Sequence, residues 1–150
     1  MEVQYGAPEN IGPWMELVSS IRSVFPGLET GAALEDHKNT VLRFMKEGRA
    51  LCVMDADGLA GVLLLSKKRN MICCLGVEGS HRGKGVGSLL LEKALSILDR
   101  SRPIEVTTYR ANDEKGTAAR KQYKKFGFQE MELVTEYGYP LQRSVLKEIS

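Results

Sequence analysis

Glycines and basic residues alternate in one short stretch of the chain, Arg82-Gly83-Lys84-Gly85-Val86-Gly87. An apolar run of strand length, Met71–Val77, precedes it, and from Val86 onward apolar residues recur with helical spacing. The first N–H groups of a helix have no internal partner and lie at the positive end of its dipole. Because glycine also lets a ligand approach the backbone closely, the ligand that suits this loop is a phosphate or pyrophosphate, with Arg82 and Lys84 adding positive charge at the rim.

Two common phosphate-binding patterns do not fit the loop. The Walker pattern needs Gly-Lys-Ser/Thr after four spacer residues, and the dinucleotide fingerprint needs Gly-x-Gly-x-x-Gly. What remains is Arg82-x-x-Gly85-x-Gly87 between a strand and a helix. This resembles the acetyl-CoA signature of the GNAT superfamily, the acyl-CoA-dependent N-acyltransferases. The plainer alternative is a glycine-rich turn that only lets strand and helix pack closely.

A second stretch resembles the same family. Ala119, Tyr123, Gly127 and Phe128 match the pattern Ala, three residues, Tyr, three residues, Gly-Phe. The family's tyrosine lies near the coenzyme sulfur, so the resemblance implies that Tyr123 protonates the leaving thiolate. The alternative is an aromatic side chain packed under the last helix. Where the family often has asparagine, seven residues before the tyrosine, this chain has Gly116, and Asn112 lies four residues further back.

The resemblance implies acetyl-CoA as acyl-donor substrate and a direct transfer to a primary amine. No metal is expected, because His37 and His81 lie far apart in the sequence and no Cys/His spacing fits a metal site. Residues 75–77 would pair through their backbone with the pantetheine arm, between parallel strands that diverge after Val77 and beyond Val106. Tyr123 is the implied catalytic residue. The implied coenzyme-binding residues are Leu75, Gly76, Val77, Arg82, Gly83, Lys84, Gly85, Val86, Gly87, Ser88, Asn112 and Ala119.

The order of elements agrees with the GNAT fold, an α/β (α+β) architecture with a central mixed, mostly antiparallel sheet, flanking helices and a parallel strand pair splayed around the coenzyme. Residues 1–150 are expected to form a single N-acetyltransferase domain. Periodicity predicts strands at residues 3–5, 50–54, 59–66, 71–77, 104–109, 128–135 and 141–146, and helices at residues 11–25, 34–47, 86–98 and 115–126. Residues 27–33 and 110–114 are predicted loops, and residues 67–70 a solvated turn.

Composition narrows the class of protein. The chain has 150 residues, 43% of them hydrophobic, and a net charge of +2, which is too small to favour nucleic acid as the main partner. No apolar run reaches the roughly 20 residues of a membrane span, and no signal peptide is evident, so we expect a cytoplasmic protein without a membrane partner. The three cysteines, Cys52, Cys73 and Cys74, fall in predicted strands as reduced residues. Adjacent on a strand, Cys73 and Cys74 should face opposite sides, and one of them could line a site.

The reaction needs a group that deprotonates the acceptor, because an alkyl amine of pKa about 10 is mostly charged at neutral pH. Glu78, Glu105 and His37 are candidate bases, and His37 is otherwise a partly buried structural histidine. The acceptor itself stays open, as a small-molecule or peptide amine. The family resemblance is compatible with a homodimer formed through the C-terminal strands. Rival functions are a non-catalytic acyl-CoA sensor of the same fold and a nucleic-acid-binding module.

Overall fold

A mixed sheet of seven strands forms the centre of the molecule. The computed structural model describes residues 1–21, 28, 30–109, 117–136 and 138–148. The strands are β1 (Glu2–Tyr5), β2 (Ala50–Asp55), β3 (Gly58–Ser66), β4 (Met71–Val77), β5 (Ile104–Tyr109), β6 (Gln129–Glu136) and β7 (Tyr139–Leu146). The α-helices are α1 (Ile11–Ile21), α2 (Gly31–Lys46), α3 (Val86–Ile97) and α4 (Thr117–Lys125), and short 3-10 turns cover Pro8–Asn10 and Gly79–His81. None of these helices is both long and apolar enough to cross a membrane.

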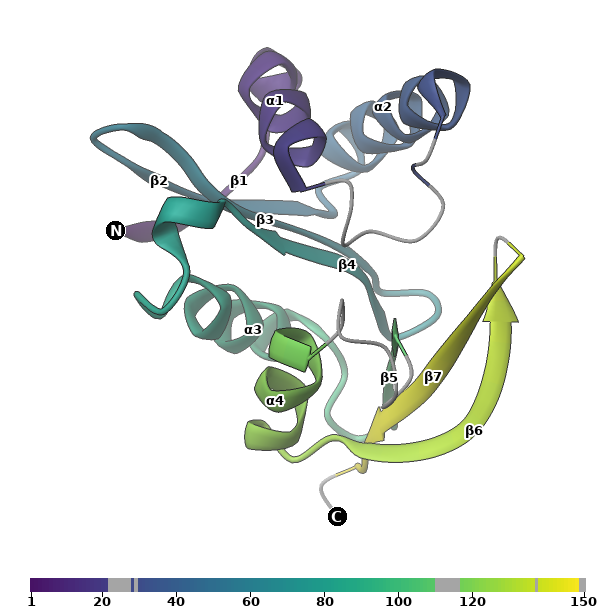
Figure 1. Ribbon diagram of the computed structural model, residues 1–150. Coiled ribbons are helices and arrows are strands. Elements are labelled where there is room, and N and C mark those ends of the chain that lie inside the picture. The colour runs from purple at the N-terminus through teal and green to yellow at the C-terminus, as the bar shows by residue number, and fades with distance from the viewer. Residues whose placement is uncertain (22–27, 29, 110–116, 137, 149–150) are drawn as a thin grey trace.

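The strand order is β1-β2-β3-β4-β5-β7-β6, and only the β4–β5 neighbours run parallel. Helices α1 and α2 cover one face of the sheet, and α3 and α4 cover the other (Figure 1). A parallel pair must be joined by a crossover, and α3 with its flanking turns supplies it. This confirms the predicted fold class.

The two faces of the sheet hold separate hydrophobic clusters because side chains alternate along each strand. On β2, Leu51 and Val53 pack toward α3, whereas Ala50 and Cys52 pack toward α1 and α2. Both faces of β3 are covered in the same way, which explains its nearly unbroken apolar sequence. The buried Cys52 therefore confirms the prediction of a core thiol.

The predicted element bounds need two corrections. Helix α2 begins at Gly31 and not near residue 34, because the Thr30 side chain accepts a hydrogen bond from the Ala33 N–H at 3.0 Å and caps the helix. Strand β7 begins at Tyr139 and includes Pro140, which pairs with β6 beyond the last pair of β5 with β7. Proline is tolerated there because its missing N–H interrupts no bond with β5. Predicted residues 22–25 and 115–116, and the predicted polar loop at 110–114, lie outside the described residues.

The turn between β3 and β4 was predicted to be solvated, and only part of it is. Lys67, Lys68 and Arg69 are exposed, but Asn70 is buried with a φ of 52°. Its side-chain amide donates to the carbonyls of Asp99 and Pro103, at 2.9 and 3.0 Å, and its Oδ1 accepts from the Asp99 N–H. Asn70 thus fastens the start of β4 to the connection that leads into β5.

Candidate functional site

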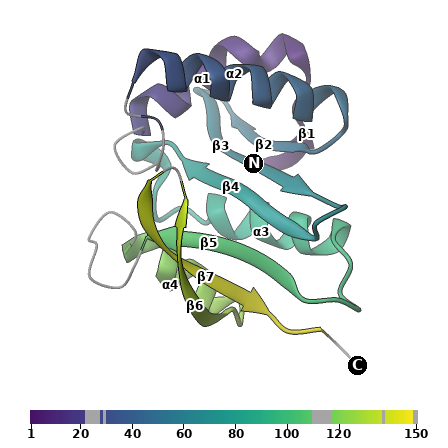
Figure 2. The same ribbon diagram turned by 90° about the vertical axis from the view of Figure 1, so that its right-hand side faces the viewer.

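A cavity of about 900 Å³ opens where β4 and β5 separate. The two strands share one backbone pair, Met71 with Glu105, and pair nowhere else within the described residues (Figure 2). The divergence therefore begins after Met71, earlier on β4 than the predicted point after Val77. Residues of α2, β4, β5, α4 and the first turn of α3 line the cavity, whose volume is in the range of small-molecule and cofactor sites.

Most of the predicted site residues meet at this one cavity. It is lined by Leu75, Gly76, Val77, Arg82, Gly83, Gly85, Val86, Gly87, Ser88, Ala119 and Tyr123. Lys84 does not line it, and its charge acts instead on Asp55, at the end of β2. Asn112 lies outside the described residues.

The glycine-rich loop takes a backbone shape that other residues resist. Gly83 and Gly85 have φ angles of +77° and +82°, in the left-handed region. Gly85 is also the N-cap of α3, and being glycine it caps no helical N–H with a side chain. Because Val86, Gly87 and Ser88 line the cavity, the uncapped first turn of α3 borders it. The local chemistry is that of an anion site.

His81 fixes the entrance to this loop. Its Nδ1 lies 2.7 Å from a carboxylate oxygen of Glu78, and its Nε2 lies 2.5 Å from one of Asp55. Glu78 and then Asp55 raise the pKa of the imidazole, and the Ser80 and His81 side chains lower the pKa of Glu78 to about 2. A protonated His81 thus ties the loop to the β2–β3 turn. Glu78, engaged in this way and outside the cavity lining, is a poor candidate base.

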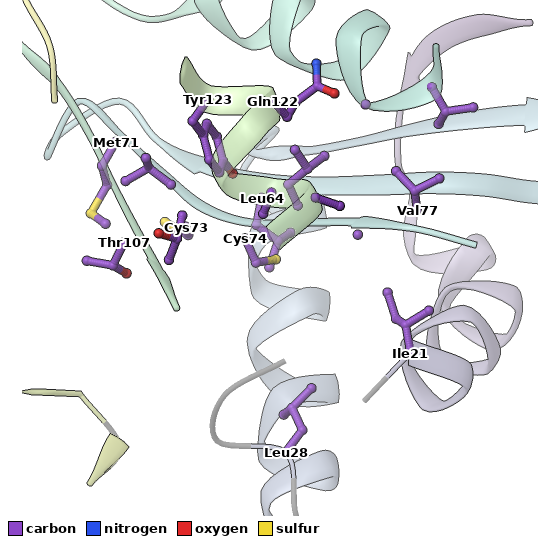
Figure 3. Close-up of a pocket in the computed structure, with 18 of the residues that line it drawn as sticks. Ile21, Leu28, Leu64, Met71, Cys73, Cys74, Val77, Thr107, Gln122 and Tyr123 are labelled. Atoms are coloured by element: carbon purple, nitrogen blue, oxygen red, sulfur yellow. The ribbon is translucent and has the colours of Figure 1, made fainter. Parts of the chain in front are cut away.

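Tyr123 is buried beside the cavity. It is 5% exposed, and its ring meets Phe128 edge to face with the centroids 5.3 Å apart. Figure 3 shows the side chain pointing from α4 toward β4, where Cys74 lies. Within the described residues its hydroxyl has no hydrogen-bond partner. Burial raises the pKa of Tyr123, so the hydroxyl keeps its proton at neutral pH.

Gln122, beside Tyr123 on α4, is a cavity residue that the sequence did not single out. Its Nε2 donates to the Ser88 hydroxyl at 2.8 Å and so joins α4 to the first turn of α3. A Cβ on Gly87 would lie 3.5 Å from the Gln122 side chain, an ordinary van der Waals distance, so Gln122 packs directly over this turn. Only the tertiary structure brings Gln122 and Ser88, which are 34 residues apart, together.

The wall opposite the glycine loop comes from α2. Six of its residues face the cavity at helical spacing, namely Ala33, Asp36, His37, Thr40, Arg43 and Phe44. Burial lowers the pKa of His37, so its imidazole is neutral at pH 7. Polar residues on an amphipathic helix usually face solvent, which is why the sequence did not predict this wall as a whole.

Cys73 and Cys74 correct another expectation. Both line the cavity, although adjacent residues of a regular strand face opposite sides. Ile72 pairs with Leu65 and Cys74 with Leu64, so Cys73 is an extra residue that bulges from β4. Figure 3 shows the two side chains close together at the cavity wall. Burial raises the pKa of Cys74 to about 12, so this thiol stays protonated.

Glu105, the third candidate base, also lines the cavity but is already paired. Its carboxylate lies 3.0 Å from the Arg143 guanidinium, which also contacts Glu132 at 2.8 Å. Within the part of the chain that the structure describes, no group of three or more His, Cys, Asp or Glu side chains is placed to hold a metal ion.

Comparison with known families agrees with this site. Residues 29–138 match the acetyltransferase (GNAT) domain family. The match covers more than half of the chain, so the chain belongs to the GNAT acetyltransferase superfamily. Members of this family use acetyl-CoA as acetyl donor. No curated protein sequence matches the chain.

Solved structures share the fold across nearly the whole chain. An N-acetyltransferase from Staphylococcus aureus Mu50 has a TM-score of 0.75 at 14% identity, covering 97% of this chain and 100% of its own. A GNAT-family acetyltransferase from Streptococcus agalactiae 2603 has a TM-score of 0.77 at 13% identity, with coverages of 99% and 96%. The PaiA N-acetyltransferase from Thermoplasma acidophilum, solved in complex with coenzyme A, has a TM-score of 0.70 at 16% identity, with coverages of 99% and 98%.

Proposed function

We propose that this acetyltransferase moves an acetyl group from acetyl-CoA directly to a primary amine while both are bound. The observation that carries the proposal is the single cavity between β4 and β5, which reaches the glycine-rich loop at one side and the α2 wall at the other. Donor and acceptor can therefore meet in one space. A direct transfer needs no covalent intermediate with the protein, which agrees with the protonated state of Cys74.

The residues present suit the coenzyme. The amides of the first turn of α3, with Arg82 beside them, would hold the pyrophosphate. The edge of β4 that faces β5 has no strand partner at residues 75–77 among the described residues, so its backbone groups can pair with the pantetheine arm. Ala119 and Ser88 line the same cavity. Asn112 stays a predicted contact.

Bound acetyl-CoA supplies a thioester whose carbonyl carbon accepts the amine and whose sulfur leaves. Tyr123 is the proposed proton donor to that sulfur, because it keeps its proton and borders the cavity beside Cys74. A backbone N–H of residues 75–77 would polarise the carbonyl as an oxyanion hole does. These roles need only groups that the cavity already contains.

His37 is the base that the arrangement favours among the candidates. It lines the cavity and its burial keeps it neutral, whereas Glu78 and Glu105 are held by His81 and Arg143. A neutral imidazole can accept the amine's proton directly or through water. The substitution His37→Gln should therefore lower kcat and remove the acidic limb of its pH profile while acetyl-CoA binding is unchanged.

The first experiment is titration calorimetry with acetyl-CoA, followed by measurement of thiol release over a panel of amines. We expect saturable binding and release with one class of amine. Binding without release by any amine would support the non-catalytic sensor instead. A folded protein that does not bind acetyl-CoA would overturn the proposal.

One substitution locates the coenzyme site. Gly85→Glu places a bulky anion at the N-terminus of α3 and should abolish acetyl-CoA binding. Gly48→Glu is the matched control, because Gly48 also has a left-handed φ of +70°, a Cβ there meets nothing within 4 Å, and it does not line the cavity. Normal binding by a folded Gly85→Glu variant would show that the loop is not the pyrophosphate site.

A further inference from the structure

Two arginines line the cavity without a carboxylate partner among the residues that the structure describes, on the side formed by α2 and the β3–β4 turn, here called the acceptor side. Arg43 lines it from α2, and Arg69 lines it from the β3–β4 turn. Among the described residues neither guanidinium forms an ion pair, although Arg43 lies over the Phe44 ring at 5.7 Å. A third arginine nearby, Arg49, stacks on Phe44 at 3.7 Å but is bonded to Glu47 at 2.8 Å. Arg43 and Arg69 therefore keep their capacity to bind an anion.

Arg69 lies close enough to the cavity wall for its charge to act there. Burial raises the pKa of the Cys73 thiol, and the charges of Arg49 and Arg69 oppose that rise. Cys73 bulges from β4 into the lining, so Arg69 stands beside the same wall. A guanidinium presents a planar fork of donors that matches a carboxylate.

Two acidic residues of the lining, Glu105 and Asp36, are not ion-pair partners of Arg43 or Arg69. Glu105 is paired with Arg143 at 3.0 Å. Asp36 precedes Arg43 by two helical turns, about 10 Å along the axis of α2. At that separation exposed charges are largely screened at physiological ionic strength. Glu136 comes from the closing hairpin, on β6. Asp36, near the start of α2, is thus separated along the lining from Arg43, near its end.

We propose that the acceptor is a small amine that also carries a carboxylate, as an amino acid does, and that Arg43 and Arg69 bind that carboxylate. This inference rests on the proposed function. Neutral amines and polyamines would leave both guanidinium groups unpaired, and a polyamine would meet their repulsion. The amine of the bound acceptor would point away from them, toward the part of the cavity bordered by Tyr123 and His37.

The test compares matched acceptors with the full chain at saturating acetyl-CoA. Each amino acid is assayed beside its carboxamide and its decarboxylated amine, with thiol release as the readout. We expect kcat/KM to be about five- to tenfold or more higher for the carboxylate, as an ion-paired hydrogen bond predicts. Equal rates for the three members of each set would overturn the proposal.

Substitutions then assign the effect to the two residues. Arg43→Gln and Arg69→Gln should each raise KM about five- to tenfold for the carboxylate acceptor and leave KM for its carboxamide unchanged. Arg102→Gln is the control, because Arg102 is exposed, pairs with Asp99 at 3.1 Å and does not line the cavity. An equal loss for carboxylate and carboxamide would contradict the assignment.

A failure of the proposed function can be told apart from a failure of this inference. If no amine releases thiol, the transferase proposal fails. Calorimetry of the same carboxylate and carboxamide pairs with the protein loaded with coenzyme A still decides the inference. Tighter binding of the carboxylate, lost in Arg43→Gln, supports it, and indifferent binding overturns it.

Discussion

At the scale of single residues, burial beside the cavity favours the protonated state of Tyr123, while ion pairing does the same for His81. Tyr123 is protonated because its phenolate would lose hydration. His81 is protonated because Glu78 and Asp55 accept from both of its nitrogens. The tyrosine is thereby suited to give a proton, whereas the histidine is suited to hold a loop in place.

Tyr123→Phe should lower the rate of the chemical step about 10²-fold, the lower range of what a general acid contributes. The packing against Phe128 survives, so stability and the Kd for acetyl-CoA should stay close to those of the wild type. Single-turnover thiol release measures the step. Tyr5→Phe, at a tyrosine that is 52% exposed, is the matched control. An unchanged rate and pH profile in Tyr123→Phe would identify Tyr123 as a packing residue.

The contacts of His81 with Glu78 and Asp55, here called the His81 brace, predict a stability that depends on pH. The folded-state pKa of His81 is raised, so its contribution is complete below the ordinary value of 6.5 and is lost as pH rises through the folded value. The pKa of Glu78 is lowered to about 2, so its contribution is complete above the ordinary value of 4.5 and is lost toward that folded value. The brace is thus strongest between about pH 4.5 and 6.5.

Denaturant titrations of wild type and His81→Gln check this window. The difference in free energy of unfolding should be largest near pH 5.5 and should shrink as the pH rises above 6.5. Asp55→Asn removes one partner of the same imidazole and should show the same trend in smaller degree. A difference that does not vary with pH would mean that His81 is neutral in the folded protein.

At the scale of elements, the site depends on how closely α3 lies over β3. A Cβ on Gly61 would come within 2.5 Å of Val86 Cγ1 and 3.0 Å of Leu90 Cδ1. Val86 opens α3 and also lines the cavity. Gly61 therefore determines how closely α3, whose first turn borders the cavity, packs on β3.

Gly61→Ala should lower the free energy of unfolding by about 1–3 kcal/mol, because the added methyl overpacks this contact. Val86→Ala in the same chain should relieve part of the clash, so the double variant should be more stable than the sum of the single losses predicts. Urea unfolding measures both. Gly12→Ala, in open space on α1, should be neutral or slightly stabilising. Additive losses would contradict direct contact.

At the scale of the whole molecule, the sheet consists of two parts, β1 to β4 and β5 to β7, that share one backbone pair. Residues of both parts line the cavity, so a ligand there contacts both parts. The exposed Met131 and Leu133 lie on β6, at the edge of the second part. A homodimer through these strands stays a prediction, which the mass in solution would decide.

Coenzyme A at 100 times its Kd should stabilise the folded chain by about 2.7 kcal/mol. For a protein of this size, that corresponds to a rise in Tm of about 5 to 10 °C. Thermal unfolding with and without coenzyme A measures the shift, and Gly85→Glu should show none. A shift that persists in Gly85→Glu would place the ligand elsewhere.

The sequence determined the parts that depend on neighbours along the chain. Apolar periodicity predicted the order of strands and helices, and the spacing of Gly83 and Gly85 predicted a loop whose left-handed φ angles only glycine adopts easily. The position of Tyr123 followed from its resemblance to a family pattern. These features depend on local backbone conformation or on a motif a few residues long.

Only the tertiary structure decided which distant residues share the cavity. The bulge at Cys73 depends on the register between β3 and β4, which sequence periodicity does not fix. His81 meets Asp55 from 26 residues away, and Gln122 meets Ser88 from 34. The α2 wall faces the cavity because β5 diverges from β4 beneath it. Contacts of this kind depend on how whole elements pack, which no local pattern records.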